Sequence, residues 1–389
     1  MKKVLYVGQF NLPETASGLR VYNIAKVMRK CGMEVSFGCF YNNKGLSYER
    51  YDDFDYFFKP VCDGSLKVLN IFDLYSDIMK IYFVKKLLHK IKPDVIVLYN
   101  STSIVTKYLQ RFSKKNDICL IADVTEWYEV SLANKRDKIV AKSVDYRIKN
   151  LDKNMDAIIS ISPFLTNYYN NLNTKVIEIP PIMYQISGKP YEHYQYEDRS
   201  RCNIVYAGSP GRKDQLDGVV KAISEINRES ILIHLDIVGV SKEEYRKKGN
   251  HIGNGISMYG RLSHEETIEI IKRADFSVLF RENLRYAKAG FSTKFAESLS
   301  LGVPVICNQV GGCDQLIKSH ENGILLPNGD YETIKESLGK ILLLSPEEIY
   351  GMKENAINTA KSFFSKEVNQ KKIKELADYL FDKKETYDQ

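Results

Sequence analysis

Hydrophobic residues in the first half of the chain form short continuous runs separated by amphipathic stretches. The runs are rich in Val, Ile and Leu without polar alternation, which is typical of strands buried on both faces of a parallel sheet. They lie at residues 3–8, 34–40, 93–100, 118–124 and 156–162. The stretches between them predict helices, such as 18–32, which we expect Ser17 to cap and Gly32 to end. This alternation predicts right-handed β-α-β crossovers.

The pattern breaks at residues 174–200, where prolines, tyrosines and mixed charges gather, and it then restarts. The second set of predicted strands lies at 203–208, 231–239, 256–260 and 275–280. A helix is expected over about 213–228, and Ser263 with Glu266 forms a capping box at the start of another. We therefore predict an α/β protein with two doubly wound, Rossmann-like domains facing each other across a cleft. The predicted boundaries are 1–185, 186–365 and a C-terminal helix over 366–389 that packs back on the first domain.

A chain of 389 residues and 44.7 kDa exceeds what one hydrophobic core usually serves, which agrees with two domains. The seven cysteines show no zinc spacing, so we expect reduced core thiols and a cytoplasmic protein. The first residues predict a strand and not a signal peptide. The apolar stretch 68–88 contains Asp73, Asp77 and Lys80, which makes it a poor membrane span.

The net charge of +7 is unevenly distributed. Residues 84–153 contain fifteen Lys and Arg against eight Asp and Glu. Such an excess either attracts an anionic membrane, here the inner face of the cell membrane, or decorates solvated helix faces. No aromatic motif or recognition-helix pattern supports binding of nucleic acid.

The stretch 288–308, KAGFSTKFAESLSLGVPVICN, carries the most informative chemistry. Phe291, Phe295 and Leu299 recur every four residues and predict a core stripe. Lys294 and Glu297 share another face of the same helix, which Ser292 or Thr293 begins. A lysine beside the free N–H groups of a helix start forms an anion site, and the carboxylate accepts hydrogen bonds from a polyol. The alternative is an exposed Lys–Glu pair on a surface helix.

A second loop, Gly208-Ser209-Pro210-Gly211, follows the first strand of the second domain and leads to Arg212 and Lys213. It matches neither the dinucleotide fingerprint nor the P-loop, but it puts two cations at a phosphate position. The alternative is a tight turn with solvated basic residues. Gly311-Gly312 supplies a third loop that would let phosphate or sugar approach the backbone.

These motifs together resemble those of the retaining glycosyltransferase family 4, which has the GT-B fold. The likeness rests on the Gly290-Phe291 to Glu297 helix with its Gly-Val-Pro-Val-Ile continuation, and on the Arg212-Lys213 loop. The matching motifs extend over the whole second domain and occur in the same order as in the family. In the first domain, 13–35 resembles the family's glycine loop, with Gly18 facing the donor phosphates.

The resemblance implies transfer of a sugar from a nucleotide-diphosphate sugar to a saccharide or lipid-linked acceptor in surface-polysaccharide synthesis, without a metal or other cofactor. Arg212 and Lys213 would neutralise the leaving diphosphate, Glu297 would hold the ribose, and the backbone at Arg261–Leu262 the base. The expected donor-binding residues are Gly18, Gly208, Ser209, Arg261, Leu262, Gly290, Phe291, Ser292, Thr293, Lys294 and Glu297.

The sequence also departs from the family pattern. Ala289 stands where a first glutamate commonly contacts the transferred sugar, and no histidine occurs between His89 and His193. Asp123 and Glu126 follow a predicted strand and either orient the sugar or acceptor, as catalytic residues, or cap a helix. Arg281 and Arg285 either hold phosphate or are solvated loop residues.

An Asp-x-Asp at 52–55 matches a metal-nucleotide motif, but its polar surroundings argue against a metal. Two other functions fit the same architecture: an inactive homologue acting as a partner subunit, which Ala289 favours, and a nucleotide-sugar epimerase. A nicotinamide-linked dehydrogenase is disfavoured because no GxGxxG follows either first strand.

Overall fold

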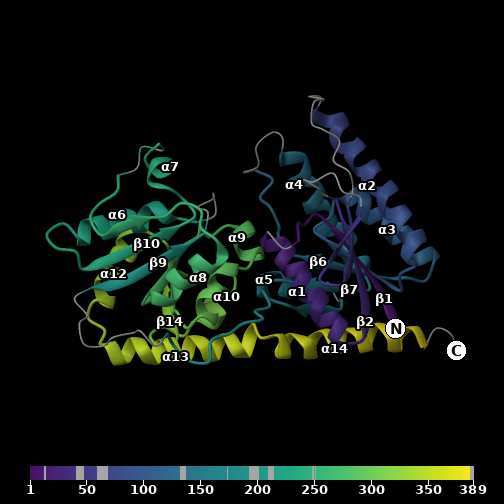
Figure 1. The fold of residues 1–389 in the computed structure, drawn as a ribbon. Coiled ribbons are helices and arrows are strands. Elements are labelled where there is room, and N and C mark those ends of the chain that lie inside the picture. Colours follow the sequence, from purple (N-terminus) through teal and green to yellow (C-terminus); the bar gives the residue numbers. More distant parts are fainter. Residues whose placement is uncertain are drawn as a thin grey trace. The chain divides into compact units, whose positions relative to one another are not determined.

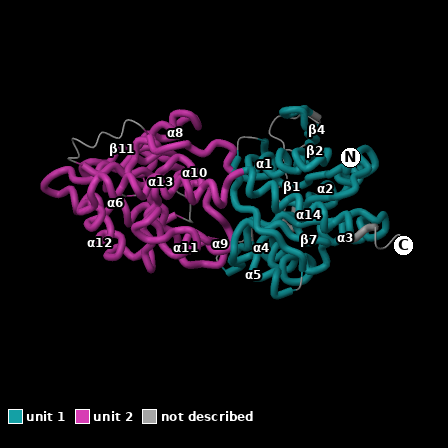
Figure 2. Tube along the Cα trace, turned by 90° about the horizontal axis from the view of Figure 1, so that it is seen from below, with its two compact units in different colours: residues 1–182, 366–389 teal, residues 183–365 magenta. Residues whose placement is uncertain are grey.

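The computed structural model describes residues 1–12, 15–40, 48–58, 69–131, 137–172, 174–191, 201–208, 214–247, 249 and 251–385. The chain divides into two compact units, which Figure 2 colours separately. Unit 1 contains residues 1–182 and 366–389, and unit 2 contains residues 183–365. Each unit is built on its own β-sheet with helices against it (Figure 1).

The sheet of unit 1 has eight strands, parallel except for one hairpin at its edge. The strands are β1 (Lys2–Gly8), β2 (Met33–Cys39), β3 (Tyr48–Tyr51), β4 (Phe54–Phe58), β5 (Val95–Tyr99), β6 (Cys119–Val124), β7 (Ala157–Ser160) and β8 (Val176–Glu178). Their order across the sheet is β3-β4-β2-β1-β5-β6-β7-β8. The predicted strands of the first half are therefore present, while the hairpin and β8 were not predicted.

Helices cover both faces of this sheet. They are α1 (Ala16–Lys30), α2 (Leu69–Ile91), α3 (Ser103–Lys115), α4 (Asp137–Tyr146), α5 (Pro163–Asn170) and α14 (Lys366–Glu385), with a π-helical turn at Arg147–Leu151 and a 3-10 turn at Asp152–Asn154. Val4 of β1 lies toward α1 and α14, whereas Leu5 and Val7 lie toward Leu87 of α2, because successive side chains of a strand point to opposite faces. The last helix, α14, packs against α1 within unit 1 (Figure 1).

One local feature of unit 1 differs from expectation, and a second gains a structural explanation. The N-cap of α1 is Thr15, whose hydroxyl accepts a hydrogen bond from the Gly18 N–H at 3.0 Å, and not Ser17. In the stretch 52–55 that contains the Asp-x-Asp, Asp52 and Asp53 form the turn between β3 and β4, with φ of 47° and 65°, and Asp55 lies in β4. Aspartate tolerates this left-handed backbone, which two-residue hairpin turns require, so the motif has a structural explanation.

The sheet of unit 2 has six parallel strands. They are β9 (Cys202–Ala207), β10 (Ile233–Val238), β11 (Ile256–Met258), β12 (Phe276–Leu279), β13 (Val305–Asn308) and β14 (Gly323–Leu326), in the order β11-β10-β9-β12-β13-β14. The helices are α6 (Leu216–Ile226), α7 (Lys242–Arg246), α8 (His264–Arg273), α9 (Arg285–Ala289), α10 (Thr293–Ser300), α11 (Cys313–Leu316), α12 (Tyr331–Ile341) and α13 (Pro346–Phe363).

Two hydrophobic clusters pack on opposite faces of this sheet. On β13, Ile306 belongs to the cluster under α6 and α12, whereas Val305 and Cys307 belong to the cluster under α10 and α13. Phe295 and Leu299 of α10 are fully buried in the second cluster, which confirms the predicted stripe. The α/β class with two parallel-sheet units is thus confirmed.

Candidate active site

The strand order of unit 2 reverses between β9 and β12, since the chain extends from β9 toward β10 and β11 on one side and from β12 toward β13 and β14 on the other. Doubly wound sheets bind ligands at this reversal, outside the carboxyl ends of the strands. Gly208 directly follows β9, Arg281 follows β12, and Asn308 ends β13. Helix α10 contributes Lys294 from its first turn.

Four side chains meet at this point in one hydrogen-bonded cluster. The Asp214 carboxylate accepts hydrogen bonds from Arg281 Nε at 3.0 Å, from the Tyr206 hydroxyl at 2.7 Å and from Lys294 Nζ. Lys294 Nζ also donates to the Tyr206 hydroxyl at 2.8 Å and lies 4.4 Å from the centre of its ring. The side chain of Lys294 is 23% exposed and that of Asp214 is 5% exposed, so the cluster is largely desolvated.

Gly208 makes room for the lysine. Its φ of 144° disfavours an L side chain, and a Cβ atom added there would overlap Cε of Lys294. The Lys294 side chain therefore passes over the glycine at the end of β9. Gly208 acts through this close approach, in addition to any contact of its backbone with a ligand.

Burial and charge act in opposite directions on the pKa values of this cluster. Burial lowers the pKa of Lys294 below its ordinary value, although the nearby Asp214 carboxylate works to raise it. For Asp214, burial works to raise the pKa, but Lys294 and Arg281 together hold it below the ordinary value. The carboxylate is therefore ionised at neutral pH and serves as counter-ion to two cations.

Glu297 lies one turn further along α10 and is half-buried, with 28% of its side chain exposed. Burial raises the pKa of its carboxyl, and His264 partly opposes this rise. His264 Nδ1 lies 3.7 Å from Glu297 Oε1. His264 is the first residue of α8, and the predicted Ser263–Glu266 capping box begins this helix. Arg261 and Leu262, predicted to lie near the base, immediately precede this cap.

The start of α10 is as the sequence predicted. Ser292 is the N-cap, and its hydroxyl accepts a hydrogen bond from the Phe295 N–H at 3.4 Å, so Thr293 is the first helical residue. Phe291 is half-buried against the core beneath α10, and Gly290 ends α9. Ala289, at the position of the missing glutamate, is fully buried.

Gly311 has φ of 72°, and its open side is filled by the backbone carbonyls of Ala287 and Gly290. That glycine therefore serves close packing of the loop onto α9. Ser209, Arg212 and Lys213 lie outside the described residues, as do Pro210 and Gly211, and their predicted contacts with a diphosphate stay predictions. Arg281 belongs to the cluster described above, and Arg285 is the first residue of α9.

Asp123, at the carboxyl end of β6, lies in a buried ion pair of unit 1. Arg20 Nη2 and Nε donate to its carboxylate at 2.7 and 3.2 Å, and the Tyr6 hydroxyl donates at 2.5 Å. Asp123 is 0% exposed, and Arg20 also donates to the Ile179 carbonyl at 2.7 Å. Because both carboxylate oxygens are engaged inside the protein, this geometry does not fit the predicted role in orienting the sugar or acceptor.

The other candidates of unit 1 are placed differently. A Cβ atom on Gly18 would overlap the carbonyl of Asn11, so this glycine lets the loop after β1 lie against α1. Glu126 is half-buried and follows β6 by two residues. Among the described residues, no group of three or more His, Cys, Asp or Glu side chains is arranged to hold a metal ion.

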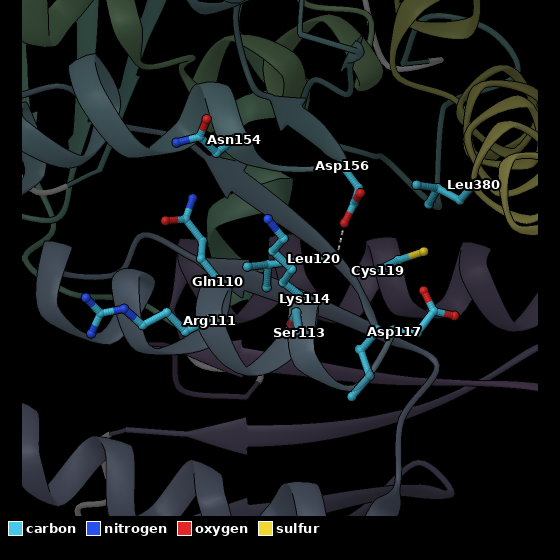
Figure 3. Close-up of a pocket in the computed structure, with 11 residues that line it drawn as sticks. Gln110, Arg111, Ser113, Lys114, Asp117, Cys119, Leu120, Asn154, Asp156 and Leu380 are labelled. Carbon is cyan, nitrogen blue, oxygen red and sulfur yellow. Dashed lines mark hydrogen bonds between the residues drawn. The ribbon is translucent and has the colours of Figure 1, made fainter. Parts of the chain in front are cut away.

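A pocket of about 660 Å³ lies in unit 1 where strands β6 and β7 begin, at the end of the sheet opposite to Asp123 (Figure 3). It is lined by Gln110, Arg111, Ser113, Lys114, Asp117, Ile118, Cys119, Leu120, Asn154, Asp156 and Leu380. One of its carboxylates, Asp156, accepts a hydrogen bond from the Leu120 N–H at 2.8 Å and thus supports the sheet. None of the predicted site residues lines this pocket.

Sequence reasoning missed several members of the clusters. Asp214 directly follows the predicted Arg212-Lys213 pair in the sequence. A carboxylate next to two cations, shortly after a predicted strand, could have indicated that it belongs to the site. Tyr206 was hidden inside a strand, and Arg20 inside an amphipathic helix. His264 has no local motif beyond the capping box, so only its position next to α10 reveals it.

Comparison with known proteins agrees with this architecture. Residues 197–363 match the family described as Glycosyl transferases group 1. An uncharacterised glycosyltransferase of Methanocaldococcus jannaschii is 26% identical over 248 residues, a match that spans 60% of this chain and 60% of that protein. The family match therefore falls within unit 2 and covers less than half of the chain.

Solved structures extend the likeness to the whole chain. Sucrose-phosphate synthase from Thermosynechococcus elongatus matches 98% of this chain and 99% of its own, with 15% identity and a TM-score of 0.76. HepE from Anabaena, solved with UDP and glucose, matches 97% and 99%, with 15% identity and a TM-score of 0.68. WaaG, a glycosyltransferase involved in lipopolysaccharide biosynthesis, matches 94% and 98%, with 13% identity and a TM-score of 0.66. The fold of the chain is GT-B, as predicted.

Proposed function

We propose that this protein is a retaining glycosyltransferase, which moves a sugar from a nucleotide-diphosphate sugar to a saccharide or lipid-linked acceptor. The observation that carries the proposal is the Lys294–Arg281 cation pair at the strand reversal of a Glycosyl transferases group 1 domain. A diphosphate is the anion that best matches two adjacent, poorly solvated cations beside a helix start.

In this proposal the cations act mainly on the leaving group. As the sugar–phosphate bond breaks, negative charge grows on the diphosphate, and Lys294 and Arg281 stabilise it in place. Positive groups that are fixed before the reaction are usually the largest single contribution to catalysis. Arg212 and Lys213 precede Asp214 directly in the chain and add to the same charge, so this transfer uses no metal.

The nucleoside lies beyond the diphosphate, along α10. Glu297 accepts hydrogen bonds from the ribose hydroxyls, and the backbone at Arg261–Leu262 lies beside the base. The HepE structure with UDP and glucose supports uridine nucleotides as the first donors to test. Ala289 removes the carboxylate that would hold the transferred sugar, so other groups select that sugar.

The acceptor binds on unit 1 and reacts on the face of the sugar that the diphosphate leaves. A leaving phosphate oxygen takes the proton of the acceptor hydroxyl, so the step needs no separate carboxylate base. This agrees with the burial of Asp123, because a buried carboxylate is not available to act as a base for the acceptor.

The proposal is tested by incubating the protein with UDP-, GDP- and other nucleotide sugars and measuring released nucleotide, with Lys294→Met as the matched inactive control. We expect slow release from one donor class and loss of that release in Lys294→Met. Release that is equal in the two proteins would contradict the proposed site. Free epimer without nucleotide release would indicate an epimerase, and no release together with an unchanged melting temperature would indicate a partner subunit.

We also propose that unit 1 binds an anionic membrane surface at the cytoplasmic side, where a lipid-linked acceptor would be presented. Helices α2, α3 and α4 lie side by side. Their exposed faces combine apolar and basic residues: Ile78, Tyr82, Lys85 and Lys86 on α2, Ile104 and Lys107 on α3, and Ile139, Val140 and Lys142 on α4. Apolar groups among lysines fit the interface of an anionic bilayer. The role of WaaG in lipopolysaccharide biosynthesis supports this kind of acceptor.

This part is tested by sedimentation with anionic and with zwitterionic vesicles at low salt. Each lysine near an anionic surface contributes about 1 kcal/mol, so Lys85→Glu with Lys86→Glu should weaken anionic-vesicle binding at least ~30-fold. Lys318→Glu with Lys340→Glu, which changes two exposed lysines of unit 2, is the matched charge control. Failure of the unaltered protein to sediment with anionic vesicles, or equal effects of the two changes, would refute membrane binding. No helix in the described parts of the chain is long and apolar enough to span a bilayer.

A further inference from the structure

We propose that Asp214 is a positioning residue, whose carboxylate holds Lys294 and Arg281 as a fixed pair of charged groups ready for the diphosphate. The inference rests on the proposed function and adds a residue that the family resemblance did not indicate. It predicts that the anion site is charged and ordered before any nucleotide binds.

The geometry around Asp214 supports this role because every donor to its carboxylate comes from a different element. Oδ1 accepts from Arg281 Nε after β12, and Oδ2 accepts from Lys294 on α10 and from the Tyr206 hydroxyl on β9. The carboxylate therefore joins three separate elements at the strand reversal. A residue that only filled space would not engage both oxygens with charged donors.

The backbone around the cluster is also fixed. Asp214 and Arg281 form an antiparallel bridge, and the Gln215 N–H donates to the Phe280 carbonyl at 2.8 Å. The Asn308 side chain bonds both to the Arg281 N–H at 3.0 Å and to the Arg281 carbonyl at 2.8 Å. Arg281 is thus held by its main chain as well as by Asp214.

Without Asp214, two cations would face each other in a poorly solvated place. Among the described residues, the charged or titratable groups bonded to or acting on Lys294 are Asp214, Arg281 and Tyr206. Burial and Arg281 favour the neutral amine, and Asp214 favours the ammonium. Removing the carboxylate therefore lowers the pKa of Lys294, and the ammonium is lost at a lower pH.

This gives a signature that a merely structural role would not produce. In the unaltered protein Asp214 favours the charged form of Lys294, so UDP affinity should fall less between about pH 7 and pH 9 than it does in Asp214→Asn. In Asp214→Asn the affinity falls as the pH rises through the lowered pKa, since the neutral amine no longer attracts phosphate. The variant should bind UDP most tightly near pH 7, where the largest fraction of its Lys294 is charged.

The experiment measures UDP binding by calorimetry from about pH 7 to pH 9 in three proteins: unaltered, Asp214→Asn and Asp214→Glu. We expect the affinity of Asp214→Asn to fall at least ~10-fold more across this range than that of the unaltered protein, because the ammonium that attracts phosphate is lost at a lower pH. The conservative Asp214→Glu should restore the profile of the unaltered protein. A loss in Asp214→Asn that is equal at every pH would overturn the inference.

A ligand-free measurement separates this inference from the proposed function. The lysine Cε–Hε signals are titrated by NMR, with Lys294→Arg identifying the Lys294 signal, in the presence and absence of the Asp214→Asn change. We expect the change to lower the titration midpoint of Lys294. An unchanged midpoint overturns the inference, whatever UDP does. A lowered midpoint in a protein that binds no nucleotide overturns the proposed function and the role for diphosphate, and leaves only the coupling of the two side chains.

Discussion

Replacement of Asp123 by asparagine tests whether the ion pair of unit 1 supports the fold or the chemistry. The structure places this carboxylate at 0% exposure, with Arg20 on both oxygens and the Tyr6 hydroxyl at 2.5 Å. The asparagine keeps the size of the side chain but removes its charge, so Arg20 becomes a buried cation without its counter-ion. Removing one partner of a buried pair typically costs about 3–5 kcal/mol.

The expected loss is directly measurable because the chain's one tryptophan, Trp127, is buried in unit 1 and reports its unfolding. For domains of about 200 residues each kcal/mol corresponds to about 2–4 °C, so we expect the melting temperature of unit 1 to fall by ~10 °C. In a urea titration followed by Trp127 fluorescence, the midpoint should fall while the slope stays the same. The double change Arg20→Met with Asp123→Asn should regain part of the loss, because it removes the stranded charge.

The reasoning is refuted if Asp123→Asn leaves the unfolding midpoint unchanged but lowers the turnover of donor by orders of magnitude. That result would return Asp123 to the role that the sequence suggested. A normal donor KM at a temperature well below the new melting point, together with the lower midpoint, supports a structural role.

Two further predictions concern unit 2. Gly208→Ala puts a methyl group where Cε of Lys294 lies and forces a φ of 144° on alanine, so UDP affinity measured by calorimetry should fall ~10-fold or more. Gly218→Ala, whose added methyl group meets only ordinary contact with Ile334, is the control. Equal UDP affinities in the two variants would contradict the steric argument. His264→Ala removes a group that lowers the pKa of Glu297, so the carboxylate that binds ribose becomes protonated at a higher pH. The acid limb of kcat/KM for the donor should therefore move to higher pH, by a small amount because His264 is 70% exposed. A limb that stays in place would exclude this coupling.

Much of the fold was predictable because buried parallel strands appear in the sequence as unbroken apolar runs. The strands around β1, β5 and β6, and the capped start of α10, depend on local chemistry that the sequence displays directly. The β3–β4 hairpin was missed because its strands lie in a polar stretch without an unbroken apolar run, and the tolerance of Asp52 and Asp53 for a left-handed backbone was not used to predict a turn.

The candidate site was only half visible for a physical reason. Lys294 and Glu297 lie on one helix, so their spacing shows that they share a face. Asp214 is brought to Lys294 and to Arg281 by the strand order, across 80 and 67 residues of chain. The role of Asp123 could not be decided from the sequence, because a carboxylate at the end of a strand looks the same there whether it binds a substrate or a buried arginine.

The most direct test of the central claim, that Lys294 and Arg281 bind the diphosphate of the donor, compares UDP with uridine by calorimetry in the unaltered protein and in Lys294→Met. A hydrogen bond to a charged group contributes about 1.5–3 kcal/mol, so the unaltered protein should prefer UDP by at least ~100-fold, and Lys294→Met should lose ~10-fold or more of that preference. Uridine binding should be the same in both proteins. Undiminished preference for UDP in Lys294→Met would contradict the account.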